Sequence, residues 1–459
     1  MIRPAATPPP LFDSKFAYGK RRPPTRAADL PDICSVGVQD LFGELEDPIH
    51  TAGQDPAVVR AATHAALANV DMSMIQPGDS VHILCSEHGF GMMGGDAYAE
   101  IIKTVRDEVI DRTGASRVKL ALSSAGSKFE QFEIIPRWGL DDYFKGQVFA
   151  FGPYDPGVAI DTEIGRLYSV QRAFAAKRLI HIHYDDPREM HYHRFNGRLL
   201  KSFTMSYARM ETRSIFHNNF PTRSANIVPR AIYESSFIRD KWAFAAVLST
   251  SPTGTMGVDA DNDLIAMDRR MTRDALQRYG KLVELFHSID ECFQVADDTR
   301  WLPYQHAGGL TACTLWESDQ DHLDLDLAAT PSPDAGNKSM VKGPVKAVVY
   351  NYAWKLGTAA ADISIAANPA VGKDLTRLHP HQDVSVAENL AQAMEMAAEK
   401  SGTDKAIVFD GCYGAINMTR PLAEELIAKA PGVARRVDDE LMPKWLAQRN
   451  LLESSKANR

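Results

Sequence analysis

The chain has a clear strand–turn–helix pattern at residues 81–96. This stretch reads Val81-His82-Ile83-Leu84-Cys85-Ser86-Glu87-His88-Gly89-Phe90-Gly91-Met92-Met93-Gly94-Gly95-Asp96. Residues 81–85 are a short apolar run typical of a buried strand, and residues 96–111 repeat apolar side chains at helical spacing. The stretch therefore predicts a strand, a glycine-rich turn and a helix, which together begin a right-handed βαβ unit.

The same alternation of strands and helices continues on both sides of this unit. We expect strands at 118–122, 148–151, 179–183, 345–350, 361–365 and 406–409, with helices at 57–69, 384–400, from Thr419 to just before Gly432, and 437–450. Such alternation is typical of an α/β protein with mostly parallel sheets. We predict an N-terminal arm (1–55), a cofactor-binding α/β domain with the catalytic motif (56–280) and a C-terminal α/β domain (281–459), with a cleft between the two domains.

Composition narrows the class of protein. The chain has 459 residues, 44% of them hydrophobic, and a formal net charge of −8, which argues against disorder and against a nucleic-acid partner. No apolar run approaches the roughly 20 residues of a membrane helix, so no membrane partner is expected. The five cysteines are odd in number and never form a CxxC motif, which favours a reducing cytoplasm.

The glycine-rich turn offers a phosphate site. Gly89, Gly91 and Gly94 match G-x-G-x-x-G between a strand and a helix, where glycines and a helix N-terminus accommodate a phosphate. A dinucleotide site also needs an acidic residue at the end of the next strand, and 123–126 supply none. The alternatives left open are another phosphate or nucleotide and a plain structural turn.

Five of the 14 histidines fall between His181 and His217. In a strand, alternate residues share a face, so His181 and His183 form one pair and His191 and His193 another. Two such pairs could begin a zinc or iron site. The alternative is that these histidines are individually satisfied, partly buried side chains.

The spacing after this segment resembles a known family. Lys201 follows His191 by ten residues, Glu211-Thr212 come next, and His217 follows Lys201 by sixteen. This pattern resembles the central motif of the nickel-dependent lactate racemase family and its α-hydroxyacid racemase and epimerase relatives. The resemblance covers about residues 75–430 and is specific at these motif positions.

The resemblance implies a cofactor and a role for each motif residue. Family members hold a nickel-pincer nucleotide, in which pyridinium-3-thioamide-5-thiocarboxylic acid mononucleotide binds nickel through sulfur and carbon. It implies that Lys201 is joined to this cofactor, that His217 is the protein ligand to nickel, and that His191 is the general base on the substrate hydroxyl. A histidine with a pKa near neutrality suits reversible proton transfer.

Two departures from the family pattern affect the substrate and phosphate contacts. The family's second catalytic histidine has no counterpart in 125–128, where Lys128 becomes the candidate second base. The alternatives are that Lys128 binds a substrate anion or is a surface lysine without a role. Its Asp-x-x-Arg phosphate loop is replaced by Ser86, Glu87 and His88, so backbone amides at Gly89 and Gly91 would hold the phosphate. These departures argue against lactate itself and suggest that the small-molecule substrate is a different α-hydroxyacid, larger or more polar than lactate.

Two other functions compete with this hypothesis. One is a zinc- or iron-dependent hydrolase or lyase that uses His181, His183, His191 and His193. The other is a binding protein that has lost catalysis, which the departures at Lys128 and at the phosphate loop motivate. The sequence does not distinguish oligomeric states.

Overall fold

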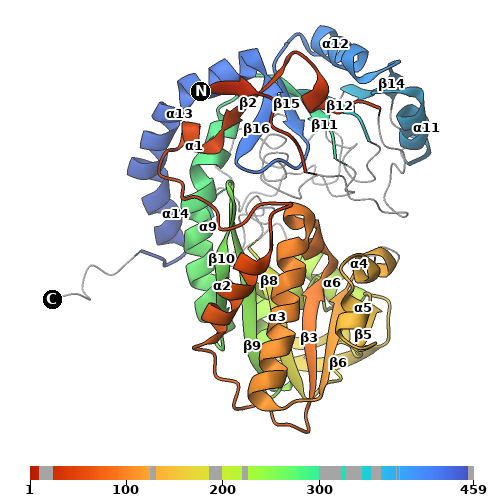
Figure 1. Cartoon of the computed structure of the whole chain (residues 1–459), viewed down its shortest axis with the longest axis vertical. Coiled ribbons are helices and arrows are strands. Elements are labelled where there is room, and N and C mark those ends of the chain that lie inside the picture. Colours follow the sequence, from red (N-terminus) through yellow and green to blue (C-terminus); the bar gives the residue numbers. More distant parts are fainter. Residues whose placement is uncertain are drawn as a thin grey trace, which may run out of the picture.

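The computed structural model describes residues 1–9, 24–124, 131–185, 199–219, 226–298, 323–325, 344–352, 363–378, 380–381 and 383–452. Within these ranges the chain is an α/β protein whose two large sheets are mostly parallel, as predicted (Figure 1).

The first sheet has six strands in the order β10-β9-β8-β3-β4-β5. Its bounds are β3 (Ser80–Ser86), β4 (Arg117–Ser123), β5 (Val148–Phe151), β8 (Arg178–Tyr184), β9 (Trp242–Ser251) and β10 (Gly254–Asp261). All neighbours are parallel except β10, which pairs antiparallel with β9. The predicted strands at 81–85, 118–122, 148–151 and 179–183 are confirmed, whereas the sequence did not indicate the β9–β10 hairpin.

Both faces of this sheet are covered, as strand alternation requires. Ile83 belongs to the core cluster under α2 (Ala57–Leu67) and α3 (Asp96–Thr113). The next residue, Leu84, belongs to the cluster under α7 (Ile227–Glu234) and the first half of α9 (Leu264–His287). The short elements beside it are α4 (Gln131–Arg137), α5 (Leu140–Tyr143), α6 (Met210–Asn219), α8 (Ser236–Arg239) and the hairpin β6 (Gly157–Thr162) with β7 (Gly165–Val170).

The second sheet has eight strands in the order β1-β2-β16-β15-β11-β12-β13-β14. Its parallel part comprises β11 (Cys292–Ala296), β12 (Val345–Tyr350), β13 (Ile363–Ala366), β14 (Val384–Val386) and β15 (Ala406–Phe409). Val348 packs on the side of α13 (Arg420–Arg436) and Val349 on the side of α12 (Leu390–Ser401). The remaining helices are α1 (Val38–Leu41), α11 (Pro369–Leu378) and α14 (Met442–Gln448).

The segment predicted as an N-terminal arm supplies two strands to this second sheet. β1 (Ile2–Pro4) pairs antiparallel with β2 (Ile33–Gly37), and β2 pairs antiparallel with β16 (Ala415–Thr419). The N-terminal strands therefore lie against the C-terminal part of the chain (Figure 1). Local sequence patterns could not indicate the pairing of β2 with β16, because the two strands are almost 400 residues apart in the sequence.

Helix α9 links the two sheets. Its 24 residues begin at an N-cap, Asp263, whose side chain accepts hydrogen bonds from the amides of Ile265 and Ala266. Met267 packs in the core of the first sheet and Phe286 in the core of the second. The expected domain boundary at residue 280 therefore falls inside one continuous helix.

Two helix boundaries in the C-terminal part differ from the prediction. The helix expected over 384–400 begins only at Leu390, because 384–386 form β14 and Asn389 caps the helix by accepting from the amide of Gln392. Gly432 lies inside α13 instead of beyond its end. No helix in the described ranges is both long and apolar enough to cross a membrane.

The carboxyl ends of the two sheets approach each other. The turn after β9 contacts the loop after β15, where the amide of Gly414 donates to the carbonyl of Pro252 over 2.8 Å. The Thr253 hydroxyl in the same turn donates to the carbonyl of Glu46 over 3.0 Å. Residues that follow the parallel strands in either sheet thus lie toward the junction of the two sheets.

Candidate functional site

The order of strands in the first sheet locates a natural ligand position. The chain runs from β3 to β4 and β5 on one side, then returns to place β8 on the other side of β3. In open α/β sheets, ligands bind outside the carboxyl ends of the strands at such a reversal, called the switch point. We call the carboxyl ends of β3, β4 and β8 the first switch point. Strand β3 ends at Ser86, and β4 and β8 are followed by Ser124 and Asp185.

The turn after β3 carries three predicted site residues. The 3₁₀ segment Glu87–Gly94 begins directly after Ser86. Ser86 and Glu87 are both buried, and the His88 side chain is partly exposed. The backbone amide of His88 donates to Ser86 Oγ over 3.4 Å, and His88 Nδ1 lies 3.3 Å from the same oxygen. His88 Nδ1 is also 3.9 Å from the Glu87 carboxylate. These three side chains therefore form one polar group at the end of the central strand.

Packing explains Gly89, the first glycine of the predicted phosphate turn. A Cβ at this position would overlap the ring of Tyr98, which is fully buried and donates its hydroxyl to the carbonyl of Ile182 over 2.9 Å. Gly95 has a φ of +87°, where a side chain is strained. Since an aromatic ring occupies the space beside Gly89, the structure favours the plain structural turn there. Gly91 lies within the same 3₁₀ segment.

Lys201 lies in a 3₁₀ turn, Leu199–Phe203, beside the end of β8. The next residue, Ser202, places its hydroxyl 3.5 Å from Nδ1 of His183 on that strand. The amide of Leu199 donates to the Asp268 carboxylate of α9 over 2.7 Å. The turn is thus fixed at both ends, and Lys201 itself is partly exposed.

Helix α6, which carries Glu211-Thr212 and His217, reaches the same edge of the sheet. The Arg213 guanidinium donates to the carbonyl of Ser124, directly after β4, over 3.3 Å. Thr212 Oγ1 accepts from the amide of Tyr168 over 2.7 Å. Position 217 follows Arg213 by four residues, and positions four apart lie on one face of an α-helix.

The first histidine pair is buried below the first switch point. The rings of His181 and His183 stack with centroids 5.1 Å apart. A hydrogen bond of 2.6 Å joins His181 Nδ1 to the Tyr207 hydroxyl, and complete burial lowers the pKa of His181 to about 3. His181 is therefore a neutral core side chain. Among the residues that the structure describes, no group of three or more His, Cys, Asp or Glu side chains is arranged to hold a metal ion.

Several predicted residues cannot be placed. His191, His193 and Lys128 lie outside the described residues, as does the side chain of His217. The structure thus places Ser86, Glu87 and His88 at the end of β3 and the Lys201 turn beside β8, and it gives no position for the proposed bases. Of the α6 motif residues, Glu211 pairs with Arg209 and Thr212 contacts β7.

The sequence also failed to indicate a second polar cluster, at the switch point of the second sheet. Asp297 follows β11 and Asp410 follows β15, and both are buried. Arg26 donates to the Asp297 carboxylate over 3.0 Å and to the carbonyl of Asp410 over 3.2 Å. Burial raises the pKa of Asp297 to about 6 in spite of this guanidinium. The sequence did contain one signal for this cluster, because Asp297 and Asp410 each follow an apolar strand directly. No feature of the sequence around Arg26 indicated that it would contact them.

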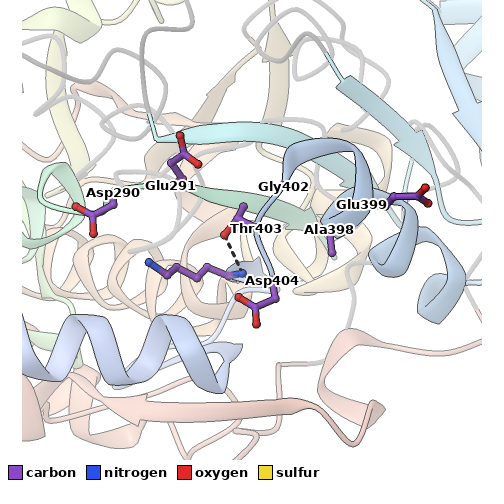
Figure 2. Close-up of a pocket in the computed structure, with 8 residues that line it drawn as sticks. Asp290, Glu291, Ala398, Glu399, Gly402, Thr403 and Asp404 are labelled. Carbon is purple, nitrogen blue, oxygen red and sulfur yellow. Dashed lines mark hydrogen bonds between the residues drawn. The ribbon is translucent and has the colours of Figure 1, made fainter.

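A surface pocket of about 1050 Å³ lies at the opposite, amino-terminal edge of the second sheet (Figure 2). Its charged lining is mostly acidic: Asp290, Glu291, Glu399 and Asp404 against Lys405. Lys405 is already paired with Glu425 at 2.5 Å. The pocket is therefore remote from the predicted motif and unsuited to an anionic ligand.

Comparison of the chain with protein-family models and with curated proteins finds no match. A role for the first switch point must therefore be argued from the residues that form it.

Proposed function

We propose that the protein is a racemase or epimerase that inverts the hydroxyl-bearing carbon of an α-hydroxyacid, with a nickel-pincer nucleotide attached at Lys201. The observation that supports this proposal is that the turn carrying Lys201 and the helix carrying Glu211-Thr212 contact the ends of β8 and β4, the two strands that flank β3. The Lys201 turn contacts the end of β8 through Ser202 and His183, while α6 contacts the end of β4 through Arg213 and Ser124.

The described residues fit an anionic, lysine-linked cofactor at two points. Lys201 is partly exposed on a turn that the Leu199 amide anchors to Asp268. Arg213 places a buried positive charge at the same edge. The fit does not extend to Gly89, where the Tyr98 ring fills the position that a phosphate cradle requires.

In this proposal each residue keeps the role that the resemblance implies. Lys201 holds the cofactor, and His217 is the protein ligand to nickel. When bound, the cofactor supplies an acceptor for the hydrogen of the carbinol carbon. His191 removes the hydroxyl proton as the hydrogen on the carbinol carbon leaves with its electron pair, which gives the planar ketone. When that hydride returns to the opposite face of the ketone, a proton returns to the oxygen, so substrate and product contain the same atoms and electrons. Lys128 is the proposed second base on the opposite face.

The thiols support a cytoplasmic setting for this proposed enzyme. Cys34, Cys85, Cys292 and Cys412 are free and buried. Free thiols are usual in a reducing compartment, which supports a cytoplasmic enzyme.

Attachment at Lys201 is tested by intact-protein mass and nickel content after co-expression with cofactor-making enzymes. We expect the wild-type chain to gain one cofactor mass and one equivalent of nickel, and Lys201→Ala to gain neither. Lys400→Ala, a surface change on α12 far from the motif, is the control and should load fully. A Lys201→Ala protein that carries stoichiometric cofactor and nickel would overturn the proposal.

A further inference from the structure

We propose that Arg278 and Ser249 form an oxyanion-binding pair at the carboxyl end of β9, where the guanidinium and the hydroxyl receive a carboxylate or phosphate group of a ligand held beside Lys201. The inference rests on the proposed function for the identity of that ligand. Neither Arg278 nor Ser249 belongs to the motif that carries the family resemblance.

The pair joins α9 to the end of β9. Arg278 on α9 donates a hydrogen bond from its guanidinium to the Ser249 hydroxyl over 2.6 Å. Ser249 is 7% exposed, and Arg278 is partly buried. A hydroxyl that accepts such a bond still has a proton to donate, and a guanidinium carries five N–H donors. Two kinds of donor therefore lie together at this strand end.

The neighbouring hydroxyls at the end of β9 differ from Ser249 because their protons are engaged. Thr250 and Thr253 each donate to a backbone carbonyl, over 2.7 Å and 3.0 Å. Ser251 Oγ lies 2.5 Å from Thr253 Oγ1, and it is the donor of that pair since the Thr253 proton is already used. In the described part of the chain, no acceptor takes the Ser249 proton. Ser249 is thus the hydroxyl of this group that has a proton for a ligand.

Arg278 also differs from other cations of α9. Arg270 and Lys281 each form ion pairs with two carboxylates. Arg278 has no carboxylate within ion-pair distance among the described residues, and its charge acts on Asp274, one helical turn earlier, only from further away. The planar donors of a guanidinium match two oxygens of a carboxylate or phosphate. The charge of Arg278 is therefore suited to a ligand oxyanion.

Strand register places this pair near the Lys201 turn. His183 on β8 pairs with β9 at a position two residues before Ser249 and on the same face. Ordinary strand spacing puts the Cα atoms of residues 183 and 249 about 8 Å apart. His183 contacts Ser202, which follows Lys201 directly, and the turn is also hydrogen-bonded to α9. A small ligand beside Lys201 is therefore within reach of the Arg278 guanidinium.

The first test measures binding of small anions to the full chain without cofactor by calorimetry. Probes are malate, its uncharged diamide and inorganic phosphate, each compared with chloride at equal ionic strength. Malate is a hydroxyacid more polar than lactate, and the diamide keeps its shape without the carboxylates. We expect malate or phosphate to bind and the diamide not to bind. Tighter binding of malate assigns the pair to the substrate carboxylate, and tighter binding of phosphate assigns it to the nucleotide phosphate.

Variants of the pair separate recognition from packing. Arg278→Met should weaken binding of the effective anion by about 10- to 100-fold, because it removes charged hydrogen bonds. Arg278→Lys should retain part of the affinity, since it keeps the charge and loses the planar fork. Ser249→Ala should weaken binding by about 3- to 10-fold. The matched control is Arg269→Met on the same helix, which removes a guanidinium bonded to the carbonyl of Asn450 and should bind as the wild type does.

Protection of Lys201 tests the placement of the ligand. Acetylation with a limiting amount of reagent, followed by peptide mass mapping, gives the modification rate of each lysine. The bound anion should slow acetylation of Lys201 in the wild type and not in Arg278→Met at the same anion concentration. Lys400, a surface lysine on α12, is the internal reference and should react at an unchanged rate.

Three results would overturn the inference. The first is that neither anion binds the wild type more tightly than the diamide does. The second is that Arg278→Met and Ser249→Ala lower Tm but leave the affinity unchanged, which would show that their hydrogen bond only supports the end of β9. The third is that a bound anion leaves the acetylation of Lys201 unchanged.

The two proposals fail independently. Cofactor attachment at Lys201 is measured by intact mass and nickel content after co-expression. Anion binding is measured on the cofactor-free chain, so a failure of attachment leaves these binding results unaffected.

Discussion

The two switch points of this molecule have the same topology and different contents. In each sheet the chain adds strands to one side of a central parallel strand and then returns to the other side. At the second switch point, Asp297 accepts from Arg26, from the amide of Ala27 and from Asn351, and Asp410 accepts from Asn417 and the amide of Cys412. The chain thus supplies the partners of these carboxylates from within.

The first switch point is assembled differently. It receives a 3₁₀ turn with a partly exposed lysine and a helix with a buried arginine, both from the segment that carries the predicted motif. A polar cluster at strand ends is therefore not in itself a ligand site, because a fold can pair such groups with one another, as it does at the second switch point.

We expect the largest change in stability from a substitution at the second switch point. Arg26→Met should lower the free energy of unfolding by about 3–5 kcal/mol, because it leaves the buried Asp297 carboxylate without its cation. Urea unfolding measures this loss. Arg3→Met removes an exposed ion pair with Asp40 and should cost about 1 kcal/mol or less. Equal losses in the two variants would contradict a structural role for Arg26.

The buried His181, below the first switch point, should make the free energy of unfolding decrease as the pH falls. Its pKa is about 3 in the folded chain and about 6.5 in the unfolded chain, so the unfolded state binds more protons between these values. This contribution is complete above about pH 6.5 and falls by up to about 1.4 kcal/mol per pH unit on acidification toward pH 3. Unfolding free energies of the wild type and His181→Leu, measured across this range, should show a shallower slope in the variant. Parallel slopes would contradict the burial argument.

A smaller effect is expected at the glycine-rich turn. Gly89→Ala should destabilise by about 1–3 kcal/mol, because the new methyl group overlaps the Tyr98 ring in a packed core. Gly78 has nothing near its position and an ordinary φ, so Gly78→Ala should stay within about 0.5 kcal/mol of the wild type. If Gly89→Ala were neutral and instead abolished phosphate binding, the turn would be a phosphate cradle after all.

Much of the fold was predictable because its signals are local. The apolar runs at 81–85, 345–350 and 406–409 are strands, and Asp96 begins a helix after a glycine turn. What failed was non-local. No pattern within residues 33–37 reveals that they pair with β16, or within residues 2–4 that they join the same sheet through β2. Helix α9 crosses the expected boundary because one amphipathic helix serves two cores.

The candidate site divides in the same way. Ser86, Glu87 and Lys201 could be selected from strand ends and motif spacing, and the structure places them at one edge. Arg213 was overlooked because burial distinguishes it from Arg209, and burial cannot be deduced from its neighbours in sequence. Arg26 was missed because its partners follow strands more than 270 residues away.

Peptide mapping of the cofactor-loaded chain by mass spectrometry tests the central claim most directly. The account predicts that the added mass lies on the peptide containing Lys201, beside the first switch point. Added mass on a lysine at the amino-terminal edge of the second sheet, such as Lys346 or Lys405, or no added mass in a chain that racemises a hydroxyacid, would contradict it.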